Sequence, residues 1–361
     1  MSTRITFLGE DRWSAHLAAG LNARFPETVE CSAVRLAHNL GALCGAARLL
    51  RDDVIVRVGF PPPTLEEYNP ALYADRSGKR ERLKRAIFRS SLGRALRKTV
   101  LFFRLPAAAK HRFAVDWLQR ATRWLRPQRR EILYWIGTDV LNAMDVANVT
   151  SKKPRYLART RSFRSITGAE RLTTELQEIG IEAKTVPYPP RIQYPPRAAT
   201  PLPATLTVLS YVPDARQEFY GLPTLVEVAR NLPHVEFLIM GGSGTGLEDP
   251  PDNMTFLGFV DDPGPLYDRS SVVVRHVMHD GAGYSMAEGL LHGRHVIYTY
   301  EVPHTIHVSF GDTDGLRRAI AALRDQQASG GLSINEAGRQ WAIEEFDADR
   351  RFRYLLDALT G

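Results

Sequence analysis

The stretch VVVRHVMHDGAGYSMAEGLLHGRHVIY, residues 272–298, decides the fold class of this chain. Its three valines at 272–274 predict a short buried strand, a turn that contains glycine follows, and residues 296–298 predict the next strand. Between them, SMAE at 285–288 fits a capping box, which predicts a helix that begins at Ser285 and ends at Gly293. Strand, turn, helix and strand in this order form a βαβ crossover, so the chain belongs to the α/β class with parallel sheets.

Two carboxylates flank the turn of this crossover. Asp280 lies in the turn, and Glu288 follows eight residues later in the first turn of the predicted helix. A helix N-terminus presents free amides and a partial positive charge, which suit a phosphate. Carboxylates accept hydrogen bonds from hydroxyls, so the pattern predicts a ligand that is both phosphorylated and polyhydroxylated. The residues leave a second interpretation open, in which Glu288 only closes the capping box and Asp280 only stabilises the turn.

The spacing Asp280-x7-Glu288 resembles the acidic-x7-Glu motif of retaining GT-B glycosyltransferases of the family 4 type. The preceding Arg275-His276-x2-His279-Asp280-Gly281 resembles the RP-x-x-HDG variant of bacterial members. The resemblance implies a GT-B fold, with two Rossmann-like domains facing across a cleft. It also implies transfer of a sugar from a UDP- or GDP-sugar to an acceptor hydroxyl with retention of configuration, without a metal or other cofactor. The acceptor is then a glycan, a lipid-linked molecule or a small molecule.

The resemblance also implies a role for each residue of the turn. Asp280 would hold the donor sugar and Glu288 the nucleotide ribose. Further donor contacts would come from the turn (Gly281, Ala282, Gly283, Tyr284 and Ser285), from His279 on the sugar, and from Gly9 and Gly242 near the phosphates and nucleotide. Relatives usually place an Arg and a Lys on the diphosphate where this chain has Tyr211 and Tyr220. We expect Arg216 or Arg275 to supply the missing cation, because a planar guanidinium suits phosphate oxygens.

A second segment with polar residues after a buried strand lies at EILYWIG, residues 131–137, followed by a predicted helix. Relatives carry His-Trp-x-Gly-[ST]-Asp here, and this chain has Tyr134 in place of the His. The resemblance places Trp135 and Thr138 on the acceptor side of the cleft, with Asp139 near the acceptor hydroxyl as a further catalytic residue. The alternative is that Thr138 or Asp139 only caps the helix.

The positive charge of the chain is regional. Its 361 residues carry a net charge of +7, and residues 76–130 hold 18 Lys and Arg against only Glu81 and Asp116. Apolar residues recur at helical spacing over 79–103 and 113–125, which predicts basic amphipathic helices inserted in the first domain. They form a solvated face, or bind an anionic membrane surface through residues 79–125. Nucleic-acid binding is disfavoured because no such module is visible.

The composition predicts two domains joined by a linker. Seven prolines between Pro187 and Pro203 predict an extended segment without a core. We therefore expect an acceptor domain over 1–190, a linker over 191–204, a donor domain over 205–345, and a terminal helix over 346–361 that packs back on the first domain.

Other classes of protein and site are disfavoured by what the sequence lacks. The first predicted strand, residues 4–9, ends in a single glycine, so no GxGxxG supports a dehydrogenase. His276 and His279 lie at a strand end without further ligands, so a metal site is disfavoured. Cys31 and Cys44 make no disulfide framework, and no signal peptide or spanning segment is visible, so we expect a cytoplasmic enzyme that contacts the inner face of the membrane if its basic helices bind lipid. The alternative function is a catalytically silent GT-B-like binding or scaffold protein, which the missing Arg and Lys favour.

Overall fold

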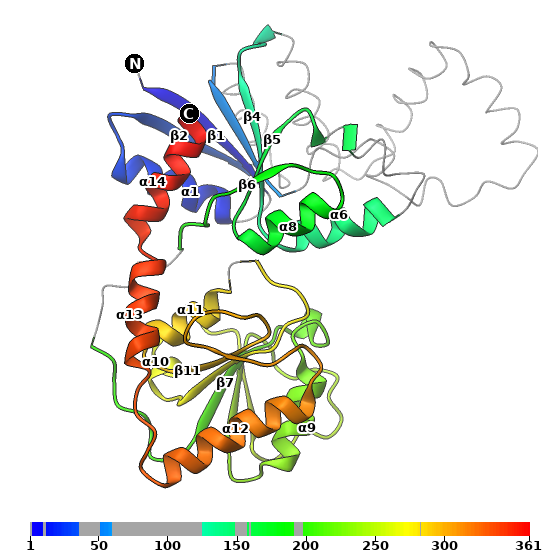
Figure 1. Cartoon of the computed structure of the whole chain (residues 1–361), viewed down its shortest axis with the longest axis vertical. Helices are drawn as coiled ribbons and strands as arrows, with labels where there is room; N and C mark the ends of the chain where they lie inside the picture. Colours follow the sequence, from blue (N-terminus) through cyan, green and yellow to red (C-terminus); the bar gives the residue numbers. More distant parts are fainter. Residues whose placement is uncertain are drawn as a thin grey trace, which may run out of the picture. The chain divides into compact units, whose positions relative to one another are not determined.

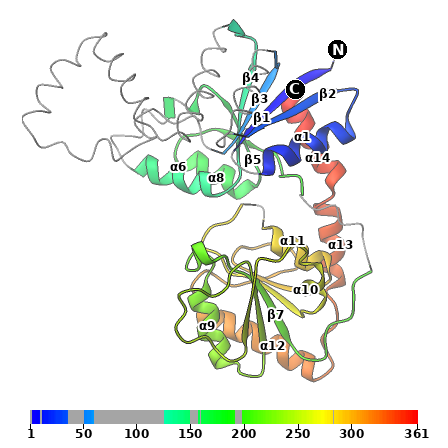
Figure 2. The ribbon, with the colours of Figure 1, turned by 180° about the vertical axis from the view of Figure 1, so that it is seen from behind.

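A computed structural model describes residues 2–9, 12–35, 51–59, 125–148, 157–158, 160–190, 198–281 and 283–361 (Figures 1 and 2). The chain divides into unit 1, residues 1–191 with 352–361, and unit 2, residues 192–351. The predicted basic helices, apart from Leu125, lie outside the described residues. So do Cys44, Ala282 and residues 191–197 of the proline-rich segment. None of the helices in the described ranges is long and apolar enough to cross a membrane.

Unit 1 is built on a sheet of six parallel strands in the order β2-β1-β3-β4-β5-β6. The strands are β1 (Thr3–Gly9), β2 (Val29–Arg35), β3 (Val54–Val58), β4 (Arg130–Trp135), β5 (Arg164–Thr167) and β6 (Ala183–Thr185). The helices are α1 (Arg12–Arg24), α6 (Thr138–Asn148) and α8 (Glu170–Glu178). The order reverses between β1 and β3, which makes the carboxyl ends of these two strands the topological switch point of the sheet.

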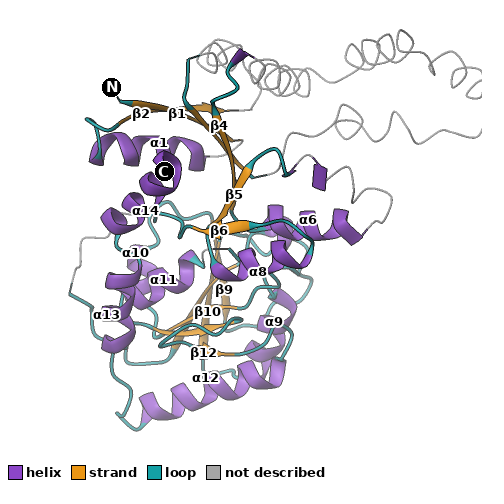
Figure 3. Ribbon diagram, turned by 45° about the horizontal axis from the view of Figure 1, so that its top comes forward, coloured by secondary structure: helices purple, strands orange, loops and turns teal. Residues whose placement is uncertain are grey.

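The central strands β3 and β4 of unit 1 are largely buried because helices cover both faces of a parallel sheet. Leu133 and Trp135 pack with α6 and α8 on one face. On the other face, Phe352 fills the space beside Gly20 of α1. Phe352 belongs to α14 (Ala348–Thr360), whose residues from 352 onward are part of unit 1. Figure 3 shows α1 and α14 on one side of this sheet and α6 and α8 on the other.

Unit 2 has a second sheet of six parallel strands, in the order β12-β11-β10-β7-β8-β9. The strands are β7 (Thr207–Tyr211), β8 (Glu236–Met240), β9 (Met254–Gly258), β10 (Val272–Arg275), β11 (His295–Tyr298) and β12 (Ile306–His307). The helices are α9 (Leu222–Asn231), α10 (Gly264–Asp268), α11 (Tyr284–Leu291), α12 (Thr313–Ala328) and α13 (Glu336–Glu345). Here the order reverses between β7 and β10.

The residues of each strand in unit 2 alternate between two cores, as the period of two requires. Val272 and Val274 of β10 belong to the core that contains α9 and α12. Val273 between them belongs to the core that contains α11 and residues of α13. The expected strand and helix pattern of residues 272–298 is therefore present, as are two Rossmann-like units with the predicted parallel sheets.

The proline-rich segment has a defined path where it is described. Arg294, which is fully buried at the start of β11, donates to the carbonyl oxygens of Thr200 at 2.8 Å and Pro201 at 3.3 Å. Gln327 of α12 donates to the carbonyl oxygen of Pro203 at 2.5 Å. Residues 198–204 are therefore held against the rest of unit 2, because the side chains of Arg294 and Gln327 donate to their carbonyl oxygens.

Candidate functional site

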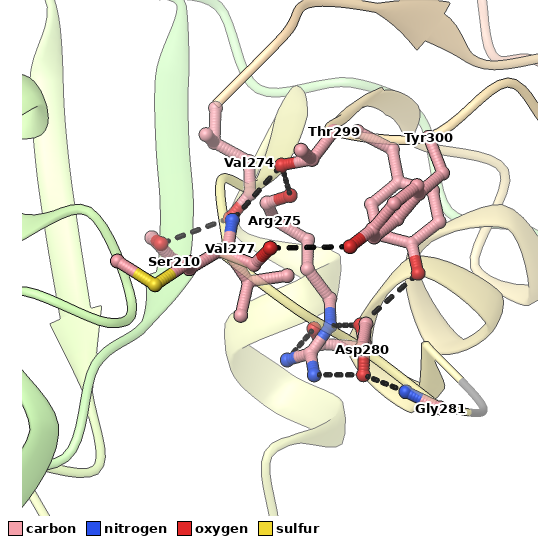
Figure 4. Close-up of polar contacts among 11 residues, drawn as sticks. Ser210, Val274, Arg275, Val277, Asp280, Gly281, Thr299 and Tyr300 are labelled. Carbon is pink, nitrogen blue, oxygen red and sulfur yellow. Dashed lines mark hydrogen bonds and ion pairs between the residues drawn. The ribbon is translucent and has the colours of Figure 1, made fainter. Parts of the chain in front are cut away.

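The carboxyl ends of β7 and β10 form the switch point of the unit 2 sheet, where ligands of open α/β sheets bind. Arg275 is the last residue of β10. The strand end is tied on both sides, because the Ser210 hydroxyl of β7 donates to the Val274 carbonyl at 2.9 Å and the Val277 amide donates to Thr299 Oγ1 at 2.9 Å (Figure 4). Arg275 is therefore presented from a rigid position.

The Arg275 guanidinium and the Asp280 carboxylate form a two-point ion pair. Arg275 Nη2 donates to Asp280 Oδ1 at 2.8 Å, and Arg275 Nε donates to Oδ2 (Figure 4). The Gly281 amide also donates to Oδ1, at 2.9 Å, and the Tyr298 hydroxyl donates to Oδ2 at 3.0 Å. The carboxylate of the motif is thus surrounded by donors from β10, the turn and β11.

The electrostatics of this pair follow from burial and countercharge. Burial of Asp280 works to raise the pKa of its carboxyl, but the charge and hydrogen bonds of Arg275 outweigh it, so the pKa lies below its ordinary value. Burial of Arg275 works to lower the pKa of its guanidinium, but Asp280 raises it above its ordinary value. Both groups therefore stay ionised over the whole physiological range.

Helix α11 begins differently from the expectation. It starts at Tyr284 after Gly283, whose backbone is left-handed at φ 59°, and no side chain caps it. The predicted capping box is therefore wrong. A Cβ at residue 283 would lie 3.0 Å from the Tyr298 hydroxyl, so both the conformation and the space require glycine. Ser285 instead has its hydroxyl 3.2 Å from Arg275 Nη1, which donates to it. Gly293 ends the helix as predicted, with its amide on the Leu290 carbonyl.

Glu288, the second acid of the motif, has a partner from a different helix. Its carboxylate accepts the hydroxyl of Tyr267 at 2.5 Å, and the fully buried Tyr267 ring stacks on His292 with centroids 5.1 Å apart. Glu288 is half-buried and lies one turn into α11, because the helix begins at Tyr284. Tyr267 of α10 therefore orients the carboxylate, for which the sequence analysis gave a ribose contact and, as the alternative, a helix cap.

Two tyrosines stand at the positions where the resemblance implied an Arg and a Lys. The Tyr211 and Tyr220 rings meet edge to face with centroids 5.5 Å apart, and the guanidinium carbon of Arg275 lies 5.6 Å from the centre of the Tyr220 ring. Burial and the neighbouring Tyr220 raise the pKa of Tyr211, so its hydroxyl stays a neutral donor. Arg275 is thus flanked by an aromatic pair as well as by Asp280.

The two histidines near the turn are both buried. The Gly311 amide donates to His276 Nε2 at 2.8 Å, and the His276 ring stacks on Phe310 with centroids 5.0 Å apart. Burial lowers the pKa of His276 to about 4, so the ring is neutral. His279 lies in the turn and is 8% exposed. Within the described ranges, no group of three or more His, Cys, Asp or Glu could hold a metal ion.

Two further predicted donor residues lie in the loops after β7 and β8. The Arg216 guanidinium carbon is 3.9 Å from the centre of the Phe219 ring. Gly242 precedes the amides of Ser243 and Gly244, which both donate to the Asp214 carboxylate at 3.0 to 3.1 Å. These hydrogen bonds, with that of Ser243 the largest cause, lower the pKa of Asp214. The glycine-rich loop therefore directs these amides at a carboxylate of the same chain.

In unit 1, the predicted acceptor residues separate by burial. Trp135 is fully buried and donates from Nε1 to Ser165 Oγ at 3.1 Å, so it belongs to the core and not to the wall of a cleft. The expectation failed because strand β4 is apolar to its last residue. Thr138 is exposed at the start of α6. Gly9 ends β1 at the switch point, against the side chain of Ser14.

Asp139 accepts hydrogen bonds from the amides before and within the first turn of α6. Its carboxylate takes the N–H groups of Ile136 at 3.0 Å, Gly137 at 2.7 Å and Val140 at 3.0 Å. The side chain is 4% exposed, and burial raises the pKa to about 6 although these hydrogen bonds lower it. Asp139 therefore stabilises the turn, and its carboxyl exchanges a proton close to neutral pH.

Sequence reasoning missed the residues that hold the two acids of the motif. Tyr298 was assigned only to a strand and Tyr267 to no element. The signal for Tyr298 was present, because a polar group at the carboxyl end of a strand beside β10 reaches the same sheet edge. Tyr267 has no such signal, since α10 is five residues long.

No protein-family model matches the sequence, and no curated protein is similar to it. Solved structures share its fold at low identity. HepE of Anabaena, in complex with UDP and glucose, is 12% identical with a TM-score of 0.58, covering 99% of both chains. A glycosyltransferase of Rickettsia africae is 13% identical with a TM-score of 0.59, covering 99% of this chain and 98% of its own. TarM of S. aureus, a structure that contains UDP, is 15% identical over 64% of this chain with a TM-score of 0.51.

These similarities define the class of fold. Two parallel six-stranded sheets with helices on both faces, matched over nearly the whole chain by HepE and the Rickettsia enzyme, are the GT-B fold of glycosyltransferases. The chain spans about half the length of TarM, 51% of that chain.

Proposed function

We propose that this chain transfers a sugar from a nucleotide-sugar donor to an acceptor hydroxyl. The observation that carries the proposal is the Arg275–Asp280 pair at the switch point of the second sheet of a GT-B fold, with Glu288 on the helix α11 that follows the turn. A buried cation at this sheet edge fits the charged diphosphate of such a donor, and the Glu288 carboxylate fits its hydroxyls. The HepE structure with UDP and glucose supports this class of ligand for the fold.

The proposed reaction proceeds with retention of configuration. The acceptor hydroxyl attacks from the face that the nucleotide leaves, and the enzyme positions both reactants and stabilises charge on the departing diphosphate. Arg275 offsets that charge, with Arg216 as the second candidate. Glu288 binds the ribose, and the turn from Gly281 to Ser285 meets the phosphates. No residue in this scheme requires a metal, and full activity in excess chelator is the expected result.

A carboxyl group with a suitable pKa is present in unit 1. The Asp139 pKa of about 6 allows the carboxylate to accept a proton from a hydroxyl near neutral pH. We therefore assign the acceptor side of the reaction to Asp139 and Thr138. Asp139→Asn should lower kcat while the affinity for UDP stays unchanged, and a normal kcat would leave Asp139 with its role in the turn.

The direct test is a panel of UDP- and GDP-sugars with release of the free nucleotide as the readout. Binding is measured separately, as the rise in melting temperature with UDP or GDP. A ligand at a hundred times its Kd stabilises the folded chain by about 2.7 kcal/mol. Glu288→Ala should abolish this stabilisation, whereas Glu227→Ala, at an exposed position of α9, should keep it. Normal stabilisation of the Glu288 variant would remove Glu288 from the nucleotide site.

A catalytically silent sugar-nucleotide-binding protein is the second candidate function. The specific observation in its favour is that Tyr211 and Tyr220 stand at the positions where the resemblance implies two cations. Such a protein binds UDP or GDP but releases no nucleotide from any sugar donor. The two measurements above, release and stabilisation, separate the two functions.

We further propose that the basic region contacts an anionic membrane surface at the inner face of the membrane. The support is the excess of Lys and Arg over residues 76–130, and residues 79–124 lie outside the described ranges. The chain should sediment with vesicles that contain anionic lipid, and less so at high salt, because exposed charges are screened. Equal failure to sediment at all salt concentrations would exclude this contact.

A further inference from the structure

The Asp280 carboxylate has no acceptor capacity left for a ligand. An ionised carboxylate offers about four lone-pair positions. Oδ1 accepts from Arg275 Nη2 and from the Gly281 amide, and Oδ2 accepts from Arg275 Nε and from the Tyr298 hydroxyl. A sugar hydroxyl could bind there only by displacing one of these four donors, three of which come from buried or nearly buried groups.

Arg275, by contrast, has donor capacity left. A guanidinium carries five N–H groups. Two are used on Asp280 and one on Ser285 Oγ, so one N–H remains on Nη1 and one on Nη2. Because the pair with Asp280 takes the Nη2 hydrogen on the side of Nε, the remaining Nη2 hydrogen is directed to the end of the planar group. The Arg275 side chain is 11% exposed, so it is not completely enclosed by the protein.

Three side chains fix the orientation of that guanidinium. Asp280 holds one edge at two points, the Tyr220 ring lies 5.6 Å from the guanidinium carbon, and Tyr298 holds Asp280. Tyr298 is 4% exposed, and its hydroxyl also lies against Gly283 at the start of α11. A single hydroxyl of β11 thus binds Asp280 within the turn between β10 and α11 and lies close to Gly283, the last residue of that turn.

We propose that Asp280 is a positioning residue and not a sugar ligand: together with Tyr298 it orients Arg275, whose two remaining N–H groups bind a phosphoryl group. This inference rests on the proposed function only for the identity of that group as the donor diphosphate. It departs from the role that the resembled motif implies for its first acid, because in this chain Arg275, the Gly281 amide and the Tyr298 hydroxyl together fill the acceptor positions of the carboxylate.

The test compares ligands with and without a sugar. The probes are inorganic pyrophosphate, UDP and the UDP- or GDP-sugar that the panel selects, each measured by calorimetry. Tyr298→Phe removes one hydroxyl from the ionised Asp280 and keeps every charge, so it should weaken pyrophosphate and UDP binding about tenfold, the value of one hydrogen bond to a charged group. Asp280→Asn should weaken both ligands further. If Asp280 binds the sugar instead, both variants weaken only the nucleotide-sugar, and that result overturns the proposal.

Tyr300→Phe is the matched control. Tyr300 is the next tyrosine with its ring close to Tyr298, 5.5 Å between centroids, and its hydroxyl donates to the Met278 carbonyl at 3.2 Å. This variant should bind all three probes as the unaltered chain does. Because Asp280→Asn leaves Arg275 buried without its counterion and could fail to fold, Tyr298→Phe carries the test by itself.

A readout without any ligand completes the experiment. The Nε–H of Arg275, assigned in NMR spectra by its loss in Arg275→Lys, should exchange slowly because a buried carboxylate accepts it, and Tyr298→Phe should accelerate the exchange about tenfold. Unchanged exchange contradicts the positioning role.

Failure of the proposed function is distinguishable from failure of this inference. If only the function fails, pyrophosphate still binds through Arg275 and Tyr298 although no sugar is transferred. Conversely, sugar transfer with unaltered pyrophosphate affinity in Tyr298→Phe leaves the function standing and rejects the inference.

Discussion

The two units each bury one aspartate at the carboxyl edge of their sheet, and the two carboxyls behave in opposite ways. Asp139 in unit 1 is 4% exposed and accepts only backbone amides, and its pKa is raised to about 6. Asp280 in unit 2 is 8% exposed and accepts a guanidinium, and its pKa is lowered. Burial is nearly equal, so the countercharge makes the difference.

This difference determines what the buried carboxyl of each unit can do chemically. Amide dipoles stabilise a buried carboxylate less than a full charge at hydrogen-bond distance does, because the Coulomb energy scales with the charge of the partner. Asp139 is therefore able to exchange a proton near neutral pH, whereas Asp280 is a permanent anion that holds a cation. The comparison can be tested through stability, from the largest expected effect to the smallest.

The largest effect is expected from breaking the charged pair. Asp280→Asn leaves Arg275 buried and unpaired, and the loss of a partner from a buried pair costs about 3–5 kcal/mol of unfolding free energy. The double variant Arg275→Met with Asp280→Asn should be less destabilised than the sum of the single variants, because no buried charge remains. Urea unfolding read by the fluorescence of Trp341 in unit 2 measures both. Additive losses would mean that the two groups do not interact.

A smaller effect on stability is expected for Asp139, caused by burial of its carboxyl and not by a charged partner. Its pKa is higher in the folded chain than in the unfolded chain, so the folded state binds the proton more tightly. Stability from this group is complete below pH 3.8 and falls by about 3 kcal/mol as the pH rises through 6. Hydrogen exchange of β4 amides across this range should show the decrease in unit 1. Asp139→Asn should remove the dependence, and an unchanged slope would contradict the assignment.

The stability of unit 2 should instead decrease as the pH falls, because of His276. Its pKa of about 4 in the folded chain lies below the unfolded value of 6.5, so the unfolded state binds the proton more tightly. Stability is complete above pH 6.5 and falls by roughly 3 kcal/mol as the pH drops through 4. Hydrogen exchange of β10 amides measures this loss. In His276→Gln, the amide oxygen replaces the acceptor for the Gly311 amide and the dependence should vanish. The exposed His234→Gln is the control and should keep it.

Much of the fold follows from local patterns. Residues 272–298 predicted strand, turn, helix and strand, and β10, α11 and β11 are found there, with the helix ended at Gly293. The glycine that ends the first strand, β1, and the apolar run that forms β4 before Thr138 were predicted from local patterns in the same way. Strand β5 was missed because its four residues RSIT are too short and too polar to show a period. Its burial comes from neighbours β4 and β6, which a local pattern does not contain.

The partners of the site residues could not be predicted. The capping box at Ser285 and Glu288 was wrong because the helix begins directly after Gly283. The spacing between Asp280 and Glu288 contains no information about their partners Tyr298 and Tyr267. Trp135 was expected on a surface, yet its ring is core because α6 and α8 cover that face of the sheet.

The sequence by itself determined the alternation of strands and helices and placed one arginine and two acids around a glycine-containing turn. Hydrophobic periodicity and glycine positions are local features, so they can be recognised in the sequence alone. Only the tertiary structure decided which of these groups are charged, saturated or in reach of a ligand. The strand order brings β11 beside β10, so the fourth hydrogen-bond donor to Asp280, the Tyr298 hydroxyl, comes from a neighbouring strand and not from the turn itself.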